Sequence, residues 1–257
     1  YTGEDTLSLH DALPILLSTS LPLVAGEKQS SSPVMKDMIS PMENTVYFLP
    51  NSDARQSQIY FYIPMGDYNR EENVRREAFN QYISGGFSGL IMNEIREKNS
   101  MAYTAYGFAS SRGLPGAQTY FSGYIGTQND KAVDAIDLYM KLLTDMPERP
   151  GRIDNIKSYL RQSALTDHPD SRNLSLRIAE WKRRGYTDDP AKEELPLIDS
   201  LTFPDIVDYY QKNIKGKPII IGVLGNPKDI SIDALKKFGK VIRLNEKKLF
   251  NEKDTMF

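Results

Sequence analysis

The sequence FNQYISGGFSGLIMNEIREKNSMAYTAYG at residues 79–107 contains the end of one helix, a second helix and the start of a strand. The first helix is predicted to end at Gly85-Gly86, because glycine is a helix breaker. Ser88 is placed to cap a second helix that runs to about Lys98, and a strand is expected from Tyr103 onward. A phosphate-binding loop is disfavoured, since a helix and not a strand precedes the glycines. The glycines are expected to let two helices pack closely.

Strand and helix patterns follow one another on both sides of this stretch. The predicted strands cover residues 46–49, 56–64, 103–109, 118–125, 218–224 and 241–244. The predicted helices are the pair around the glycines and five more, whose patterns begin near residues 127, 153, 174, 203 and 231. The stripe at residues 74–82 and the stripe of Leu174, Ile178 and Trp181 recur at helical spacing.

The pattern at residues 56–64 predicts a central strand, because both its isoleucine face and its tyrosine face (Tyr60 and Tyr62) are apolar enough to be covered. The loop SSRGLPG at residues 110–116 joins two strands as a hairpin. Mixed strands and helices with a hairpin indicate the α+β class. We expect a mixed, largely antiparallel sheet of about six strands covered by helices.

Composition excludes several kinds of function. The 257 residues carry 32 Lys+Arg and 34 Asp+Glu, a formal charge of −2, so the chain lacks the basic footprint of a nucleic-acid binder. There is no cysteine, which removes disulfides, thiol catalysis and thiolate metal sites. The two histidines, His10 and His168, leave little room for metal or triad chemistry. The composition therefore argues against a self-contained hydrolase.

The chain is expected to divide into four parts. Residues 1–15, which include His10, resemble a translated sequencing-adapter remnant. Residues 16–44 are interpreted as the end of a preceding unit and a polar linker, residues 45–245 as one domain, and residues 246–257 as a polar tail. Neither a signal peptide nor a membrane span is predicted, because acidic residues precede the short apolar run at 12–25 and prolines interrupt it.

Two further polar groups are interpreted as structural. His168 lies between two aspartates and before a proline, which is typical of a turn. Lys182, Arg183 and Arg184 lie at a helix end, where the helix dipole favours cations, so a solvated helix end is preferred to a binding site.

The stretch at residues 79–107 resembles a signature of the pitrilysin/insulinase family of zinc metallopeptidases. The shared features are the glycine helix break, a helix that ends in Ile95-Arg96-Glu97, and Met101-Ala102-Tyr103 at the opening of a strand. Arg96 and Tyr103 match the Arg and Tyr pair of the C-terminal half of that family. The resemblance extends over residues 45–245 in the order of elements.

The resemblance implies a specific role. Members of the family are built from duplicated α+β units whose two halves close over an unfolded peptide, and the zinc motif H-x-x-E-H lies in the N-terminal half alone. This chain lacks that motif. It is therefore expected to be the non-catalytic C-terminal domain, inactive by itself, with zinc bound by a catalytic partner domain or subunit. The family also favours a bacterial periplasm or cell envelope over the cytoplasm.

Arg96 and Tyr103 are the expected substrate-binding residues, and no catalytic or metal-binding residue is expected in this chain. The family places this pair next to the substrate. A guanidinium offers a rigid fork of donors and a phenol offers one directional donor. Both can hydrogen-bond a peptide carbonyl and stabilise the oxyanion that forms when it is attacked. Without the resemblance, Arg96 would be read as a complement to a helix C-terminus and Tyr103 as a core aromatic.

Two other kinds of function stay open. A unit without zinc ligands can serve as a structural or assembly subunit of a catalytic chain. A third reading is a peptide-binding module that offers an exposed strand edge to extended chains.

Overall fold

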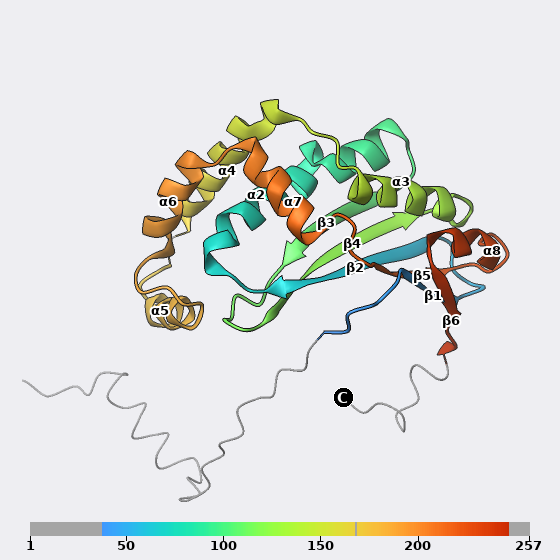
Figure 1. Ribbon diagram of the computed structural model, residues 1–257. Helices are drawn as coiled ribbons and strands as arrows, with labels where there is room; N and C mark the ends of the chain where they lie inside the picture. Colours follow the sequence, from blue (N-terminus) through green and yellow to red (C-terminus); the bar gives the residue numbers. More distant parts are fainter. Residues whose placement is uncertain (1–37, 168, 247–257) are drawn as a thin grey trace, which may run out of the picture. The chain divides into compact units, whose positions relative to one another are not determined.

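Six strands form one mixed sheet in the spatial order β3-β4-β2-β5-β1-β6 (Figure 1). The computed structural model describes residues 38–167 and 169–246. β2 is antiparallel to β4 and β5, and β3 is antiparallel to β4, whereas β1 is parallel to β5 and β6. The strands are β1 Thr45–Pro50, β2 Ser57–Asp67, β3 Thr104–Ser110, β4 Gln118–Thr127, β5 Ile220–Gly225 and β6 Lys240–Arg243. The predicted α+β class and largely antiparallel sheet are confirmed.

Helices α2, α3 and α7 lie over one face of this sheet (Figure 1). The α-helices are α2 Asn73–Ser84, α3 Ala132–Thr144, α4 Ile153–Thr166, α5 Leu174–Arg183, α6 Pro190–Ser200, α7 Phe203–Asn213 and α8 Ile232–Leu235, and a π-helix covers Met92–Lys98. Within the described ranges, no helix combines the length and the apolar character that crossing a membrane requires.

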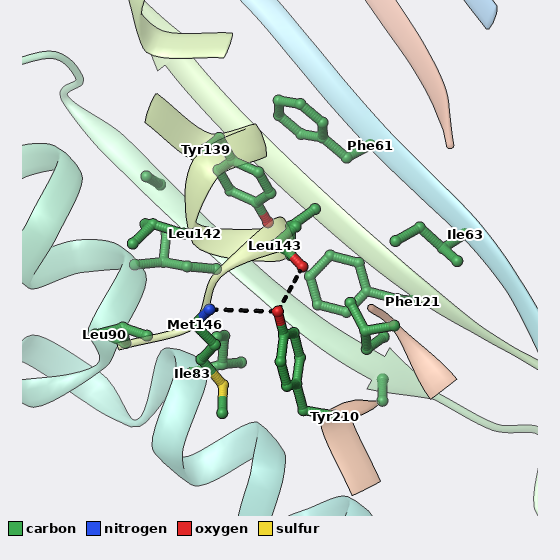
Figure 2. Packing of buried hydrophobic residues seen from close by; sticks show 14 of the residues in the cluster. Phe61, Ile63, Ile83, Leu90, Phe121, Tyr139, Leu142, Leu143, Met146 and Tyr210 are labelled. Atoms are coloured by element: carbon green, nitrogen blue, oxygen red, sulfur yellow. Dashed lines mark hydrogen bonds between the residues drawn. The ribbon is translucent and has the colours of Figure 1, made fainter. Parts of the chain in front are cut away.

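The hydrophobic core lies between the sheet and these helices, and Figure 2 shows its centre. Phe61 and Phe121 project from neighbouring strands and are buried. Tyr210 of α7 enters the same core, where its hydroxyl donates to the carbonyl of Leu143 at 3.0 Å and accepts from the N–H of Met146 at 3.3 Å (Figure 2). The buried phenol oxygen thus has both partners, which avoids the cost of an unsatisfied polar group.

β2 lies inside the sheet, between β4 and β5, as the sequence predicts. Its isoleucines and Phe61 face the helices and are buried. The expectation that the tyrosine face is also covered is wrong for the described residues, because Tyr60 is 51% exposed. Alternation alone shows that a face is apolar; it does not show what packs on it.

The glycine break follows α2 as predicted, and the predicted stripe of α2 at residues 74–82 is buried. Gly86 takes a left-handed conformation with φ of 59°. At Gly89 an added Cβ would lie 2.7 Å from the Cα of Ser84, so the chain packs closely against the end of α2. Ser88 is not the predicted helix cap: its hydroxyl donates to the carbonyl of Gly85 at 3.1 Å, and the helical turn begins at Leu90.

The second half of the chain corrects two expectations. The stripe of α4 is buried at Ile156 and Leu160, as predicted. The stripe of α5 does not enter the core, since Leu174 is 43% exposed and this helix buries no residue. Helix α6 was not expected, because Pro196 within it removes a backbone donor and ordinarily indicates a helix end.

Several predictions fall on residues that the structure does not describe. These are the adapter remnant at 1–15 with His10, the end of a preceding unit at 16–37, the turn at His168 and the tail at 247–257. The division of the chain into these parts stays a prediction. At the basic helix end, Lys182 and Arg183 are exposed as expected, whereas the guanidinium of Arg184 lies 5.7 Å from the centre of the Tyr186 ring.

Candidate functional site

The segment after the glycine turn brings Arg96 and Tyr103 to one surface hollow. Ile95 is fully buried and fixes the π-helix to the core. The chain then reverses at Ser100, which has a left-handed φ of 51° and donates its N–H to the carbonyl of Arg96 at 2.9 Å. The N–H of Met101 returns to the carbonyl of Ile95 at 2.9 Å. A short, tightly bonded reversal therefore holds the two predicted residues near each other.

The hollow is open to solvent and has a volume of about 350 Å³. The side chain of Arg96 is 45% exposed and Tyr103 is 59% exposed. The hollow is lined by residues 96–97, 100–103, 127–128 and 131. One short loop thus brings both groups to one hollow, while their role toward a substrate stays a prediction.

Tyr103 is held by two hydrogen bonds, and neither of them uses the proton of its phenol hydroxyl. Its backbone N–H donates to the carbonyl of Gly126 at 2.9 Å. Its phenol oxygen accepts a hydrogen bond from Nε2 of Gln128 at 3.1 Å. Because the amide donates, the phenol O–H is free to donate to another group. Tyr103 is thus arranged as a hydrogen-bond donor toward the hollow.

Positive charge exceeds negative charge around the hollow. Arg96 and Lys131 contribute cations and Glu97 contributes the carboxylate. Nε of Arg96 lies 3.7 Å from Oε1 of Glu97, a distance too long for a strong hydrogen bond. Nζ of Lys131 donates to the carbonyl of Ser100 at 3.3 Å. The donors present can bind a peptide carbonyl or a carboxylate.

Gln128 and Lys131 are residues of the hollow that the sequence analysis did not select. Both follow β4, at the start of the turn into α3. Antiparallel pairing of β3 with β4 places Thr104 opposite Gly126 and so brings these side chains beside Tyr103. The hairpin pattern was the available signal, but its register was needed to identify them.

Glu94, which does not line the hollow, holds the π-helix in place. Its carboxylate pairs with Arg149 of the turn before α4 and with Lys98, at 2.9 Å for the lysine. Its carbonyl accepts a hydrogen bond from the side chain of Asn99 at 2.7 Å. The contact with Arg149 ties the helix that carries Arg96 to the turn before α4, while Lys98 and Asn99 lie at the end of the same helix.

β3 is an edge strand, and α2 already occupies part of its free edge. The N–H of Gly107 donates to Oγ of Ser84 at 2.8 Å. Asn80 bonds Ala109 twice, accepting from its N–H at 2.7 Å and donating to its carbonyl at 3.0 Å. A peptide strand could not add at these residues without displacing α2, which counts against an open-edge peptide module at β3.

The described residues do not fit a zinc ion. Within residues 38–167 and 169–246, no three His, Cys, Asp or Glu side chains are grouped to hold a metal. Glu97 is the carboxylate of the hollow, whose described lining contains no imidazole. A protein zinc site needs three or four such ligands.

Comparisons with known proteins agree with the family resemblance. Residues 26–150 match the family model of the peptidase M16 inactive domain. This match to the inactive, non-catalytic domain of M16 peptidases confirms the resemblance to the pitrilysin/insulinase type. Comparison with curated protein sequences gives no match.

Solved structures share the fold at low sequence identity. A peptidase M16 inactive domain from Pseudomonas fluorescens has a TM-score of 0.62 and 16% identity, over 84% of this chain and 50% of that chain. A protease from Helicobacter pylori has a TM-score of 0.62 and 12% identity, over 85% of this chain and 53% of that one. The periplasmic protease PqqL from Escherichia coli has a TM-score of 0.59 and 17% identity, over 84% of this chain and 24% of that chain. The chain spans about half the length of the first two.

Proposed function

We propose that this chain is the substrate-binding, non-catalytic half of a zinc metallopeptidase that degrades peptides. The zinc would be bound by a catalytic partner domain or subunit, since the described residues offer no ligand set for it. The single observation that carries the proposal is that Arg96 and Tyr103 line one open hollow with their donor groups exposed. The match of residues 26–150 to the peptidase M16 inactive domain supports the pairing with a catalytic half.

Each residue has a defined part in this proposal. Arg96 binds a carbonyl of an unfolded peptide through its guanidinium fork. Tyr103 donates its phenol proton to the same peptide, with Gln128 holding the phenol oxygen from behind. Neither residue transfers a proton or bonds covalently to the substrate. Their donors orient the peptide and stabilise negative charge that develops on its carbonyl oxygen.

The test uses the enzyme in which this chain is combined with its catalytic half. Arg96→Ala and Tyr103→Phe should each lower kcat/KM on the order of 10²-fold, the usual effect of losing one such donor. Matched controls are Arg183→Ala and Tyr159→Phe, which alter an exposed arginine and an exposed tyrosine outside the hollow. These controls should keep wild-type kinetics.

Wild-type kinetics in both site variants would instead support the second candidate, a structural or assembly subunit. The absence of a zinc ligand set from the described residues favours that candidate over a self-contained enzyme. An H-x-x-E-H motif in the same or the neighbouring reading frame would indicate a catalytic companion. Its absence from both would favour a scaffold.

A periplasmic or cell-envelope location also belongs to this proposal. Its support is the structural similarity to a periplasmic protease of Escherichia coli. Fractionation of the native host, followed by detection of the chain, would test it. Recovery in the cytoplasmic fraction alone would contradict it.

A further inference from the structure

Lys131 lies in the hollow with Arg96 and Tyr103, and the proposed contact with a peptide carbonyl does not use it. The residue is half-buried. Its ammonium group has three N–H donors. Within the described residues, its one side-chain hydrogen bond runs to the carbonyl of Ser100 at 3.3 Å, longer than a typical N–H···O bond. Most of the hydrogen-bonding capacity of this cation is therefore available to a ligand.

The position of Lys131 is not explained by the stability of its own helix. Lys131 ends the 3₁₀ turn Asn129–Lys131, which leads directly into α3. The partial positive charge at a helix N-terminus disfavours a cation there. Asp130 and Asp134 are the nearest carboxylates in the sequence, yet no ion pair joins either of them to Lys131 in the part of the chain that the structure describes. The charge of Lys131 thus has no compensating partner within its helix.

Two neutral donors lie beside this ammonium group. The N–H of Lys131 donates to the carbonyl of Gln128 at 3.1 Å, and side chains three residues apart in a 3₁₀ turn lie on the same side. One amide hydrogen of Gln128 is used on the phenol of Tyr103, which leaves the second for a ligand. Ser100, whose carbonyl contacts the ammonium, also lines the hollow and carries a hydroxyl. The donors of this part of the hollow therefore lie close together.

The charges that line the hollow favour an anion. Glu97 is the carboxylate of the lining, and its Oε1 lies 3.7 Å from Nε of Arg96, so it offsets the charge of Arg96 in part. Lys131 keeps its full charge among the described lining residues. The anionic group of an unmodified peptide is a carboxylate, which accepts hydrogen bonds from ammonium, amide and hydroxyl groups alike.

We infer that Lys131, together with the amide of Gln128, forms a carboxylate-binding subsite beside the carbonyl-binding pair. The hollow then favours peptides that carry a carboxylate close to the bond that is cleaved. This inference rests on the proposed function, which makes a peptide the ligand. The carboxylate is either an Asp or Glu side chain or the free C-terminus, since both present the same two oxygens. Lys131 is thus a specificity-determining residue that does not contact the reacting atoms.

Paired peptides test the inference on the enzyme in which this chain is combined with its catalytic half. One set exchanges Glu for Gln at successive positions on either side of the cleaved bond, and a second set exchanges a free C-terminus for an amide. At one position or at the C-terminus, the carboxylate peptide should have a kcat/KM at least about threefold above its neutral partner, within the range of a partly exposed charge contact. The preference should shrink at high salt, because salt screens such charges.

Variants of Lys131 assign the preference to this side chain. Lys131→Gln should remove it while leaving kcat/KM for the neutral peptide within about twofold of wild type, unlike Arg96→Ala, which should lower kcat/KM for both peptides. Lys131→Glu should reverse the preference, so that a Lys peptide is cleaved better than the Glu peptide. Lys215→Gln, an exposed change outside the hollow, is the matched control and should keep the wild-type preference. Anisotropy of labelled peptides on the zinc-depleted complex gives the same comparison as dissociation constants, without turnover.

The outcomes separate the two proposals. Equal kinetics and equal binding for every carboxylate and neutral pair would overturn the subsite, as would a preference that Lys131→Gln retains. If this happens while Arg96→Ala and Tyr103→Phe still lower kcat/KM, the subsite fails and the proposed function stands. A preference that disappears in Lys131→Gln, with wild-type kinetics in the Arg96 and Tyr103 variants, would instead support the subsite and contradict the carbonyl-binding role of that pair.

Discussion

Tyr139 shows how single residues determine the packing under the sheet. Its ring stacks on Phe61 with centres 4.0 Å apart, and its hydroxyl donates to the carbonyl of Tyr106 at 2.9 Å. Complete burial raises the pKa of Tyr139 well above its ordinary value. A Cβ on Gly123 would lie 2.1 Å from the Tyr139 hydroxyl oxygen, and one on Gly107 would lie 2.4 Å from it. The two strands therefore need glycine where this ring lies.

Gly123→Ala should lower the free energy of unfolding by about 1–3 kcal/mol, because the added methyl overlaps a fully packed ring. Urea unfolding measures it. Gly222→Ala is the matched control: its Cβ would meet nothing closer than the Cβ of Tyr60 at 3.8 Å, so it should be neutral or slightly stabilising. Adding Tyr139→Phe should recover part of the loss, since the hydroxyl is the closest atom. Equal midpoints for the two glycine variants would contradict this account.

At the scale of elements, the start of α7 is held by one carboxylate. Asp205 accepts from the N–H of Thr202 at 2.9 Å and from its hydroxyl at 2.6 Å, and it pairs with Arg75 of α2 at 2.9 Å. Partial burial by itself raises the pKa of Asp205, but the Thr202 hydrogen bonds and the Arg75 charge outweigh it and hold the pKa below its ordinary value. Asp205 therefore joins α7 to α2 in its ionised form.

Asp205→Asn should lower the free energy of unfolding at pH 7 by about 1 kcal/mol, as for the loss of a helix cap. A carboxyl whose pKa is lower in the folded state stabilises above its unfolded pKa of about 3.9 and loses that effect as pH falls through the folded pKa. The difference from wild type should therefore disappear by about pH 2. Thermal unfolding at several pH values measures it. Asp208→Asn, an exposed change on the same helix, should show no such pH-dependent difference.

The elements also show which predictions a pattern supports. β2 and α2 combine strong periodicity with the right length, so both were predicted close to their observed bounds. The stripe of α5 has the same periodicity, yet its residues lie exposed, because a stripe reports that a face is apolar and not that a neighbour covers it. α6 was missed because a proline within a helix can be tolerated only when the surrounding fold compensates for the missing donor.

For the whole molecule, the hollow is the part of the described surface to which we assign a contact with substrate. The hollow lies where β3 begins and β4 ends, so two neighbouring strands and the loops next to them position its side chains.

Purified residues 16–257 should therefore carry no stoichiometric zinc and should cleave no peptide by themselves. Elemental analysis after dialysis, together with an assay on an unstructured fluorogenic peptide, measures both. The catalytic half treated in the same way is the positive control. About one zinc ion bound per chain of residues 16–257, the content of a mononuclear protein zinc site, would contradict the assignment.

The sequence by itself determined the α+β class, the helix break at Gly85-Gly86, the absence of a cysteine, and Arg96 and Tyr103 as a candidate pair, because these follow from local periodicity, composition and a short motif. Only the tertiary structure decided that Gln128 and Lys131 join that pair, that Asn80 and Ser84 occupy the β3 edge, and that the tyrosines form an exposed face. The physical reason is that strand register and the choice of which apolar face is buried depend on contacts between residues far apart in the chain.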